Sequence, residues 1–265
     1  MPRVHHATMV GNAVLDSVLR ERAGRSLAVF LDYDGTLTPI VERPEAAVLA
    51  EDTRVVLCSL VQHCTVAVVS GRDLEDVRRR VGIVELYYAG CHGFDIQGPG
   101  VRYEHPLAHA GAAKLREVAE EIARDVRGIG GVELEAKRFA LAVHYRRARE
   151  AEAPAVRGAV ERALARHSGL RLSEGKKVLD LQPDIPWDKG RAVLWLLQAL
   201  RLERKDVLPL YVGDDLTDED AFRALAERGV GIAVHEDRRP TAARFTLRNP
   251  GEVRTFLAGL ARAAG

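Results

Sequence analysis

The feature that most constrains this chain is an apolar run that ends in two carboxylates separated by one residue. Residues 27–31 are apolar, Asp32 and Asp34 follow, and Gly35 and Thr36 come next. Such a run predicts a buried parallel strand, and the glycine predicts the turn at its carboxyl end, where ligands of open α/β sheets bind. Alternation predicts that both carboxylates share one face, where charges ~4 Å apart repel by roughly 4 kcal/mol at an effective dielectric of about 20. A bound cation or a proton-transfer reaction would explain the pair.

Short apolar runs alternate with helical patterns before and after a middle section of the chain. This alternation predicts a doubly wound parallel sheet, a Rossmann-like α/β core. Strands are predicted at 27–31, 65–69, 86–89, 207–212 and 230–234. Helices are predicted at about 10–23, 51–62, between Asp73 and Gly82, at 188–200, at 218–228, and after Asn249-Pro250.

The middle section has a different pattern, which predicts an inserted α+β module. The alternating segments 132–135 and 140–145 predict antiparallel strands. Two further strands, at 170–174 and 177–181, and two helices, at about 107–126 and 153–167, complete it. The predicted domains are therefore a core of residues 1–103 and 185–265 and an insertion of residues 104–184.

Composition and charge argue against several classes of protein. The 265 residues are 47% hydrophobic and 29% charged, as in ordinary globular chains. The formal net charge of +1 does not favour nucleic acid or an anionic membrane, and the basic cluster at 146–149 lacks interleaved aromatic residues. No apolar run approaches the roughly 20 residues of a membrane span, and the first six residues lack a signal peptide's apolar stretch. Three cysteines without CxxC spacing suggest neither a disulfide framework nor a zinc site, so a cytoplasmic location is expected.

Two further motifs lie at the start of predicted helices. Ser70, Gly71 and Arg72 follow the strand at 65–69, and a hydroxyl with backbone N–H groups at a helix N-terminus can bind an anion. The same residues also suit a simple capped turn. Lys189 opens another helix, where its charge opposes the helix dipole, so either an anionic partner or a solvated surface position would explain it.

Five acidic residues follow the predicted strand at 207–212. Acids in the first turn of a helix are ordinary, which accounts for Asp218, Glu219 and Asp220. Capping does not account for Asp214 and Asp215, which lie at the end of the strand. With Asp32 and Asp34 on a neighbouring strand, Asp214 supplies the oxygen ligands that Mg²⁺ prefers. The sequence therefore predicts a magnesium site.

In this order, the four motifs resemble the trehalose-6-phosphate phosphatase family of the haloacid dehalogenase superfamily. The similarity covers about residues 27–234, and every superfamily motif position is filled. It rests on the strings at 31–41, 69–72, 87–93, 187–190 and 211–222. One departure is Cys91 before His92, where a small polar residue is more usual.

The resemblance implies Mg²⁺-dependent hydrolysis of trehalose 6-phosphate to trehalose and phosphate, the last step of trehalose biosynthesis. The substrate is then a small-molecule sugar phosphate, and a trehalose-6-phosphate synthase is the expected functional partner. Asp32 would be the nucleophile that forms an aspartyl-phosphate, and Asp34 would act as general acid and then as general base. Ser70 and Lys189 would hold the phosphoryl oxygens.

The resemblance also implies the metal ligands and their support. The ligands would be the Asp32 carboxylate, the Asp34 backbone carbonyl and the Asp214 carboxylate. Asp215 and Asp218 would support them, with Asp215 orienting Lys189 or a metal-bound water.

The inserted module would act as a cap that selects the sugar. The resemblance assigns sugar contacts to Glu135, Lys137, Glu174 and Lys176, although charges on a half-exposed strand are often merely solvated. Further predicted substrate-binding residues are Thr36, Arg72, His92 and Gly93. Thr36 either fixes Asp34 or serves only as a turn hydroxyl, and His92 either lines the cleft or is structural.

Other functions stay open at this point. A related phosphatase acting on sucrose 6-phosphate or mannosyl-3-phosphoglycerate would share these motifs. A phosphomutase is disfavoured, because its cap usually follows the first motif directly. A non-catalytic sugar-phosphate sensor would be expected to lack Asp32, Asp34 or Asp214, and all three are present.

Overall fold

The computed structural model describes residues 11–237 and 239–265, so the predicted helix start at Val10 and the first six residues lie outside the described part. The chain divides into two compact units. The first comprises the residues up to Arg102 together with Asp188–Gly265, and the second comprises Tyr103–Trp187. The inserted unit thus starts one residue before the predicted 104–184 segment and ends three residues after it.

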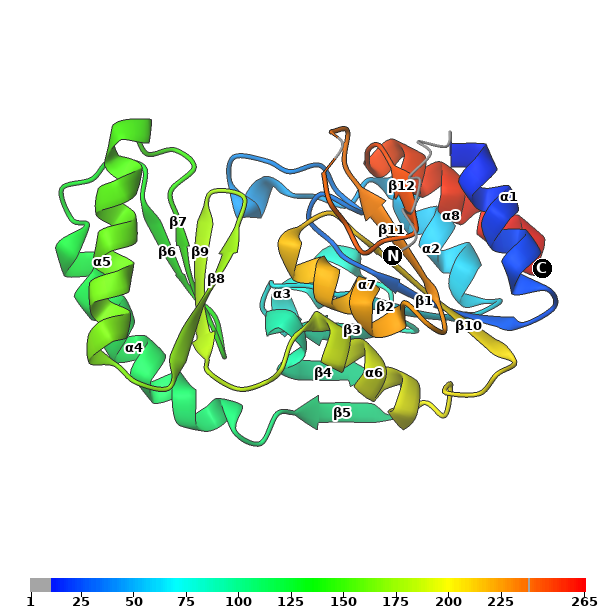
Figure 1. The fold of residues 1–265 in the computed structure, drawn as a ribbon, viewed down its shortest axis with the longest axis horizontal. Helices are drawn as coiled ribbons and strands as arrows, with labels where there is room; N and C mark the ends of the chain where they lie inside the picture. Colours follow the sequence, from blue (N-terminus) through cyan, green and yellow to red (C-terminus); the bar gives the residue numbers. More distant parts are fainter. Residues whose placement is uncertain (1–10, 238) are drawn as a thin grey trace. The chain divides into compact units, whose positions relative to one another are not determined.

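The first unit is built on an eight-stranded sheet with the order β12-β11-β10-β1-β2-β3-β4-β5 (Figure 1). Neighbouring strands from β12 to β3 are parallel, and β4 is antiparallel to β3. The strands are β1 (Ser26–Leu31), β2 (Thr65–Val69), β3 (Tyr87–Gly90), β4 (Asp95–Gly98), β5 (Val101–Glu104), β10 (Val207–Gly213), β11 (Val230–Val234) and β12 (Phe245–Leu247). The predicted α/β class is therefore confirmed. The sequence did not predict β4, β5 or β12, because these short strands carry no long apolar run.

Helices cover both faces of this sheet. They are α1 (Gly11–Arg22), α2 (Glu51–Val61), α3 (Leu74–Val81), α6 (Lys189–Ala199), α7 (Glu219–Leu225) and α8 (Pro250–Ala264), with the short 3-10 turns η1 (Pro44–Ala46), η2 (Cys91–Gly93) and η4 (Leu216–Asp218). One core joins α1, α2, α3 and α8 to alternate strand residues such as Leu210 and Val212. Tyr211 lies between these two and contacts Phe222 of α7 with ring centroids 5.7 Å apart, so α7 covers the opposite face.

Local sequence explains why two helices begin beside the carboxyl ends of the strands. Asp73 accepts the backbone N–H of Glu75 at the start of α3, which ends at Gly82 in the left-handed conformation. Asp188 accepts the backbone N–H of Arg191, so α6 begins at Lys189. The structure therefore places Ser70, Gly71 and Arg72 before a helix and Lys189 at the first position of another, as the sequence predicted.

The second unit is a four-stranded antiparallel sheet with two helices on one face (Figure 1). Its sheet order is β6-β7-β9-β8. The elements are α4 (Ala108–Asp125), β6 (Glu133–Ala136), β7 (Leu141–His144), the turn η3 (Glu150–Glu152), α5 (Ala153–Arg166), β8 (Leu170–Gly175) and β9 (Val178–Pro183). Apolar residues of α4 and α5 share a core with one face of this sheet, and the other face carries polar side chains. Among the residues that the structure describes, no helix combines the length and hydrophobicity needed to cross a bilayer.

Candidate active site

The candidate site is built from loops at the carboxyl ends of neighbouring parallel strands. Asp32 directly follows β1, and its backbone N–H donates to the carbonyl of Val212 on β10 at 2.9 Å. Asp214 directly follows β10. Because β1 and β10 are adjacent and parallel, these two acidic residues are brought to the same edge of the sheet, as the sequence predicted.

A buried lysine joins two of the acidic residues. Lys189 Nζ lies 2.7 Å from Asp32 Oδ1 and 2.7 Å from Asp218 Oδ1. Burial alone would lower the pKa of Lys189, but the charges of Asp218 and Asp32 hold it well above its usual value. Burial raises the pKa of Asp32 well above its usual value, with the opposing effect of Lys189 and further contributions from Asp218 and Asp214. The site therefore holds more carboxylates than this one cation can neutralise.

Asp218 organises the loop that carries Asp214. The Asp218 side chain is 0% exposed, and its Oδ2 accepts the backbone N–H groups of Asp214 and Asp215 at 2.9 Å each. Its Oδ1 accepts the Tyr211 hydroxyl at 2.7 Å in addition to Lys189. Four donors thus use both oxygens, which makes Asp218 a support for the loop.

Of the two roles predicted for Asp215, the structure gives the contact with Lys189 to Asp218, and the orientation of a metal-bound water stays a prediction. The Asp215 carboxylate accepts the backbone N–H of Leu216 at 2.8 Å and caps η4. The acidic residue that holds Lys189 is Asp218, together with Asp32. The contribution of Tyr211 could not be predicted from the sequence, because a tyrosine in a buried strand is usually part of the core.

Three acidic side chains could hold a metal ion here. One carboxylate oxygen from each of Asp32, Asp214 and Asp218 lies within 4.8 Å of the others, and all three residues are buried. A Cβ placed on Gly35, whose φ is +85°, would lie 2.2 Å from Asp214 Oδ2, so only glycine lets this carboxylate lie against the loop after β1. Carboxylate oxygens suit a hard cation such as Mg²⁺. The residues present therefore fit the predicted ion.

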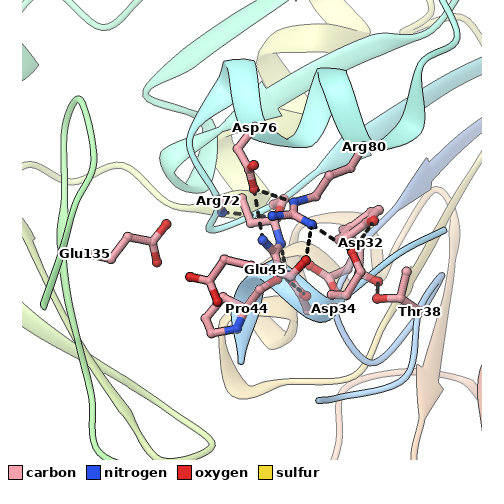
Figure 2. Close-up of polar contacts among 12 residues, drawn as sticks. Asp32, Asp34, Thr38, Pro44, Glu45, Arg72, Asp76, Arg80 and Glu135 are labelled. Carbon is pink, nitrogen blue, oxygen red and sulfur yellow. Dashed lines mark hydrogen bonds and ion pairs between the residues drawn. The ribbon is translucent and has the colours of Figure 1, made fainter. Parts of the chain in front are cut away.

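The Asp34 side chain binds Arg72, whereas Asp32 binds Lys189. Arg72 Nε donates to Asp34 Oδ2 and Arg72 Nη2 to Asp34 Oδ1, both at 2.7 Å (Figure 2). Because β1 ends at Leu31, strand alternation does not govern the direction of the Asp34 side chain. Arg72, predicted to contact substrate, binds Asp34 and Asp76 in this structure. The buried Thr36 Oγ1 has no hydrogen-bond partner among the described residues, so no such bond links it to Asp34.

The loops after β2 and β3 pack against each other beside this site. Ser70 Oγ accepts the backbone N–H of Arg72 at 3.1 Å, and the Ser70 carbonyl accepts that of His92 at 2.9 Å. His92 has a positive φ of 57°, and its buried ring lies so close to Gly71 that a Cβ there would meet it at 2.8 Å. Gly93 also has a positive φ, 94°. The structure thus brings Ser70, His92 and Gly93 together.

The polar face of the inserted sheet carries a hydrogen bond and an ion pair. His144 Nε2 lies 2.8 Å from Glu135 Oε2, and Lys137 Nζ lies 3.2 Å from Asp180 Oδ1. Burial would raise the pKa of Glu135, but the bond from His144 and the charge of Lys137 hold it below its usual value. Sequence reasoning missed Asp180; the signal was a polar residue alternating with apolar ones in Val178–Pro183.

The structure does not place Glu174 on this polar face. Ser173 pairs with Asp180 in register, whereas Glu174 pairs with Leu179, whose side chain packs against α4 and α5. Glu174 accordingly binds Arg157 of α5 through both oxygens. Lys176 lies in the turn between β8 and β9, where its carbonyl accepts Arg146.

Comparison with known proteins identifies the family. The profile of the trehalose-phosphatase family matches residues 30–251. A Mycobacterium tuberculosis (strain H37Rv) protein named "Uncharacterized glycosyl hydrolase" is 47% identical over 258 residues, which are 94% of this chain but 19% of that protein. The present chain thus spans about a fifth of the length of this relative.

Two further relatives carry the family's name. Trehalose 6-phosphate phosphatase RA3 of Zea mays is 40% identical over 269 residues, covering 96% of this chain and 74% of the relative. The solved C-terminal domain of the C. albicans trehalose-6-phosphate phosphatase has the same fold, with a TM-score of 0.83 at 23% identity over 98% of this chain and 99% of that one. The chain therefore belongs to the trehalose-phosphatase family.

Proposed function

We propose that this chain is a Mg²⁺-dependent phosphatase that hydrolyses trehalose 6-phosphate to trehalose and phosphate. The observation that carries the proposal is the buried group of Asp32, Lys189, Asp218 and Asp214 where β1 and β10 end. Family membership supports the substrate, because the Zea mays relative, which is 40% identical over 96% of this chain and 74% of its own length, is named for it. A cytoplasmic location and an upstream synthase that supplies the substrate are part of the proposal.

Asp32 is the proposed nucleophile. Its carboxylate oxygen would attack phosphorus, the bond from phosphorus to the sugar oxygen would break, and an aspartyl-phosphate would form. Lys189, already 2.7 Å from Asp32, and Ser70 would hold the phosphoryl oxygens and offset their charge. Asp218 keeps Lys189 charged and in place from the other side.

Asp34 is the proposed general acid and base. In the first step it would give a proton to the leaving sugar oxygen, and in the second it would take one from the attacking water. The second step breaks the bond between phosphorus and Asp32 and regenerates the carboxylate. The Asp34 side chain is 40% exposed, so substrate and water can reach it.

The ion would be held by the carboxylates of Asp32 and Asp214 and by the backbone carbonyl of Asp34. When bound, it supplies positive charge that offsets the repulsion between the carboxylate and the phosphate. This accounts for the excess of buried acidic groups over Lys189.

The polar face of the inserted sheet is the proposed source of sugar selectivity. Glu135 and Lys137 stay the proposed sugar contacts, and we add Asp180 because it lies beside Lys137 on the same face. Glu174 and Lys176 stay predictions of the resemblance. The partnership of Glu174 with Arg157 would have to break for Glu174 to reach a sugar.

A phosphate-release panel tests the proposal. The substrates are trehalose 6-phosphate, sucrose 6-phosphate, glucose 6-phosphate and mannosyl-3-phosphoglycerate, each with Mg²⁺ and with EDTA. We expect the largest kcat/KM for trehalose 6-phosphate and loss of activity in EDTA that Mg²⁺ restores. Preference for another ester would overturn the substrate and leave the chemistry, whereas no release from any ester would favour a sensor.

Variants of the inserted sheet test selectivity separately. Lys137→Met is expected to raise KM for trehalose 6-phosphate and to leave hydrolysis of p-nitrophenyl phosphate, which has no sugar, unchanged. The control is Lys177→Met, which removes an exposed lysine paired with Glu150. An equal loss on both substrates would show that Lys137 acts on folding and not on the sugar.

A further inference from the structure

The contacts of Arg72 assign it a role that the sequence did not. We propose that Arg72, supported by Asp76, is a positioning residue that fixes the carboxyl group of Asp34 for proton transfer. The proposal rests on the proposed function, since it takes Asp34 as the general acid and base. It replaces the predicted role of Arg72 in substrate binding.

Nearly all donors of the Arg72 guanidinium are already engaged. Besides the two bonds to Asp34, Nη2 donates to the Pro44 carbonyl at 2.8 Å and Nη1 donates to Asp76 Oδ2 at 2.9 Å (Figure 2). The guanidinium also lies 5.3 Å from the centre of the Tyr33 ring. Its side chain is only 8% exposed. A buried arginine with four of its five N–H groups committed has little capacity left for a substrate phosphate.

Asp76 binds the Arg72 nitrogen that does not contact Asp34. Arg80 Nε donates to Asp76 Oδ2 at 2.7 Å and Arg79 Nη2 donates to Asp76 Oδ1 at 2.8 Å, so with Arg72 one carboxylate links three arginines of the α3 region. Burial would raise the pKa of Asp76, but hydrogen bonds from Arg80 and Arg72 lower it. Asp76 therefore stays ionised and fixes the direction in which Arg72 points.

The same network holds the chain that follows Asp34. Arg80 Nη1 donates to the carbonyls of Glu45 and Ala47 at 3.0 Å each, and the Tyr33 hydroxyl donates to the Ala47 carbonyl at 3.0 Å. With the bond from Arg72 to Pro44, the segment after the first motif is thus tied to α3. Asp34 is held both through its side chain and through its own loop.

The bidentate hydrogen bond from Arg72 suits a carboxyl group that must stay in one orientation. A guanidinium fork binds both carboxylate oxygens in one plane, which removes the rotational freedom that a partly exposed aspartate would have. Each oxygen keeps a second lone-pair position, where Asp34 would carry the proton that goes to the leaving group in the first step and accept the proton of the water in the second. Lysine, a single point donor, cannot impose this plane.

The inference predicts a dependence on the leaving group. Nitrophenolate departs with the electron pair of the broken bond and needs no proton, so transfer of the phosphoryl group to Asp32 does not need Asp34. Departure of the trehalose alkoxide does need that proton. The second step, in which water loses a proton as it attacks phosphorus, needs Asp34 for both substrates.

The experiment is rapid-quench kinetics of the full chain with both substrates and Mg²⁺. In Arg72→Gln, the first turnover of p-nitrophenyl phosphate should release nitrophenolate at the wild-type rate, and steady turnover should then fall about 10²-fold. With trehalose 6-phosphate, the first turnover should fall as well. Asp34→Asn should give the same pattern, and Arg72→Lys should recover only part of the loss because it lacks the fork.

Arg78→Gln is the matched control, since Arg78 lies on the same helix as Asp76 but binds Glu75 and Gln97. We expect the first turnover and the steady turnover of Arg78→Gln to stay near wild type. Equal losses in Arg72→Gln and Arg78→Gln, or a raised KM with unchanged kcat in Arg72→Gln, would overturn the inference in favour of a structural or a substrate-binding role. If wild type hydrolyses p-nitrophenyl phosphate but not trehalose 6-phosphate, the substrate proposal fails while this test still reports on Arg72. Arg72→Lys serves the same test if Arg72→Gln does not fold.

Discussion

The ammonium group of Lys189 lies 2.7 Å from a carboxylate oxygen of Asp32, although the two residues are 157 positions apart in the chain. Both side chains are almost fully buried, at 3% and 6% exposure. Lys189 is shared with Asp218, which is buried completely. A buried charge is tolerated only when it is paired, so this contact couples the stability of the core to the chemistry proposed for it.

Replacing Lys189 by methionine should therefore affect folding as well as activity. Two buried carboxylates lose their cation, and breaking such a pair costs roughly 3–5 kcal/mol of unfolding free energy. We expect a lower midpoint of chemical denaturation and phosphate release reduced by at least about 10²-fold. The matched control is Arg191→Gln, an exposed residue on the same helix, which should change neither quantity.

Added Mg²⁺ provides a second readout for the Lys189→Met variant. A bound cation would offset part of the unpaired negative charge, so Mg²⁺ should raise the melting temperature of the variant more than that of wild type. A variant as stable as wild type without Mg²⁺ would contradict the account of this pair.

Gly35 allows a separate test of how Asp214 is placed. In Gly35→Ala the new Cβ would lie 2.2 Å from Asp214 Oδ2, so the carboxylate must move. We expect weaker Mg²⁺ binding in a calorimetric titration and loss of phosphate release. Gly100→Ala is the control, because Gly100 also has a positive φ (+70°) but nothing within 4 Å.

Comparison of the two glycine variants separates strain from contact. The positive φ alone costs about 1 kcal/mol in each. Equal Mg²⁺ affinity in both variants would show that the Gly35 backbone does not position Asp214.

The convergence of the two acidic segments was predictable from the sequence. The apolar runs before Asp32 and Asp214 define buried parallel strands, and parallel strands end at a common edge. Local patterns also placed Lys189 at a helix start, as the structure has it. These features depend on short segments and on one general rule of sheet geometry.

The partners of individual side chains were not predictable in this way. Arg72 and Asp34 are separated by 38 positions, and nothing in either segment shows that the arginine turns to the aspartate instead of to a ligand. The sequence pattern places Asp180 in a strand but does not show its partner, because Lys137 lies 43 positions earlier. Glu174 belongs to the helix-covered face because of its register with β9, which the sequence alone does not fix.

The contacts of Glu135 with His144 and Lys137 predict a pH dependence of stability. His144 and Lys137 hold the pKa of Glu135 below its usual value against the effect of burial, so ionised Glu135 stabilises the folded state. Its contribution is fully present above the unfolded pKa of about 4.3 and is lost as the pH falls through the lower folded pKa. The difference in unfolding free energy between wild type and Glu135→Gln should therefore shrink as the pH is lowered from 5 to 3.

Glu133→Gln serves as the comparison, since Glu133 lies on the same strand but pairs with Arg147 at an exposed position. The difference in unfolding free energy between wild type and Glu133→Gln should stay small throughout this pH range. A difference for Glu135→Gln that did not change with pH would show that the His144 and Lys137 contacts contribute nothing to folding.

The most direct test of the whole account is to locate a phosphoryl group on the protein during turnover. The Asp34→Asn variant, mixed with p-nitrophenyl phosphate and Mg²⁺, quenched in acid and digested, should carry one phosphoryl group on the peptide that contains Asp32. Asp34→Asn combined with Asp32→Asn should carry none. Absence of phosphate from that peptide while nitrophenolate is released, or its presence on another residue, would contradict Asp32 as the nucleophile.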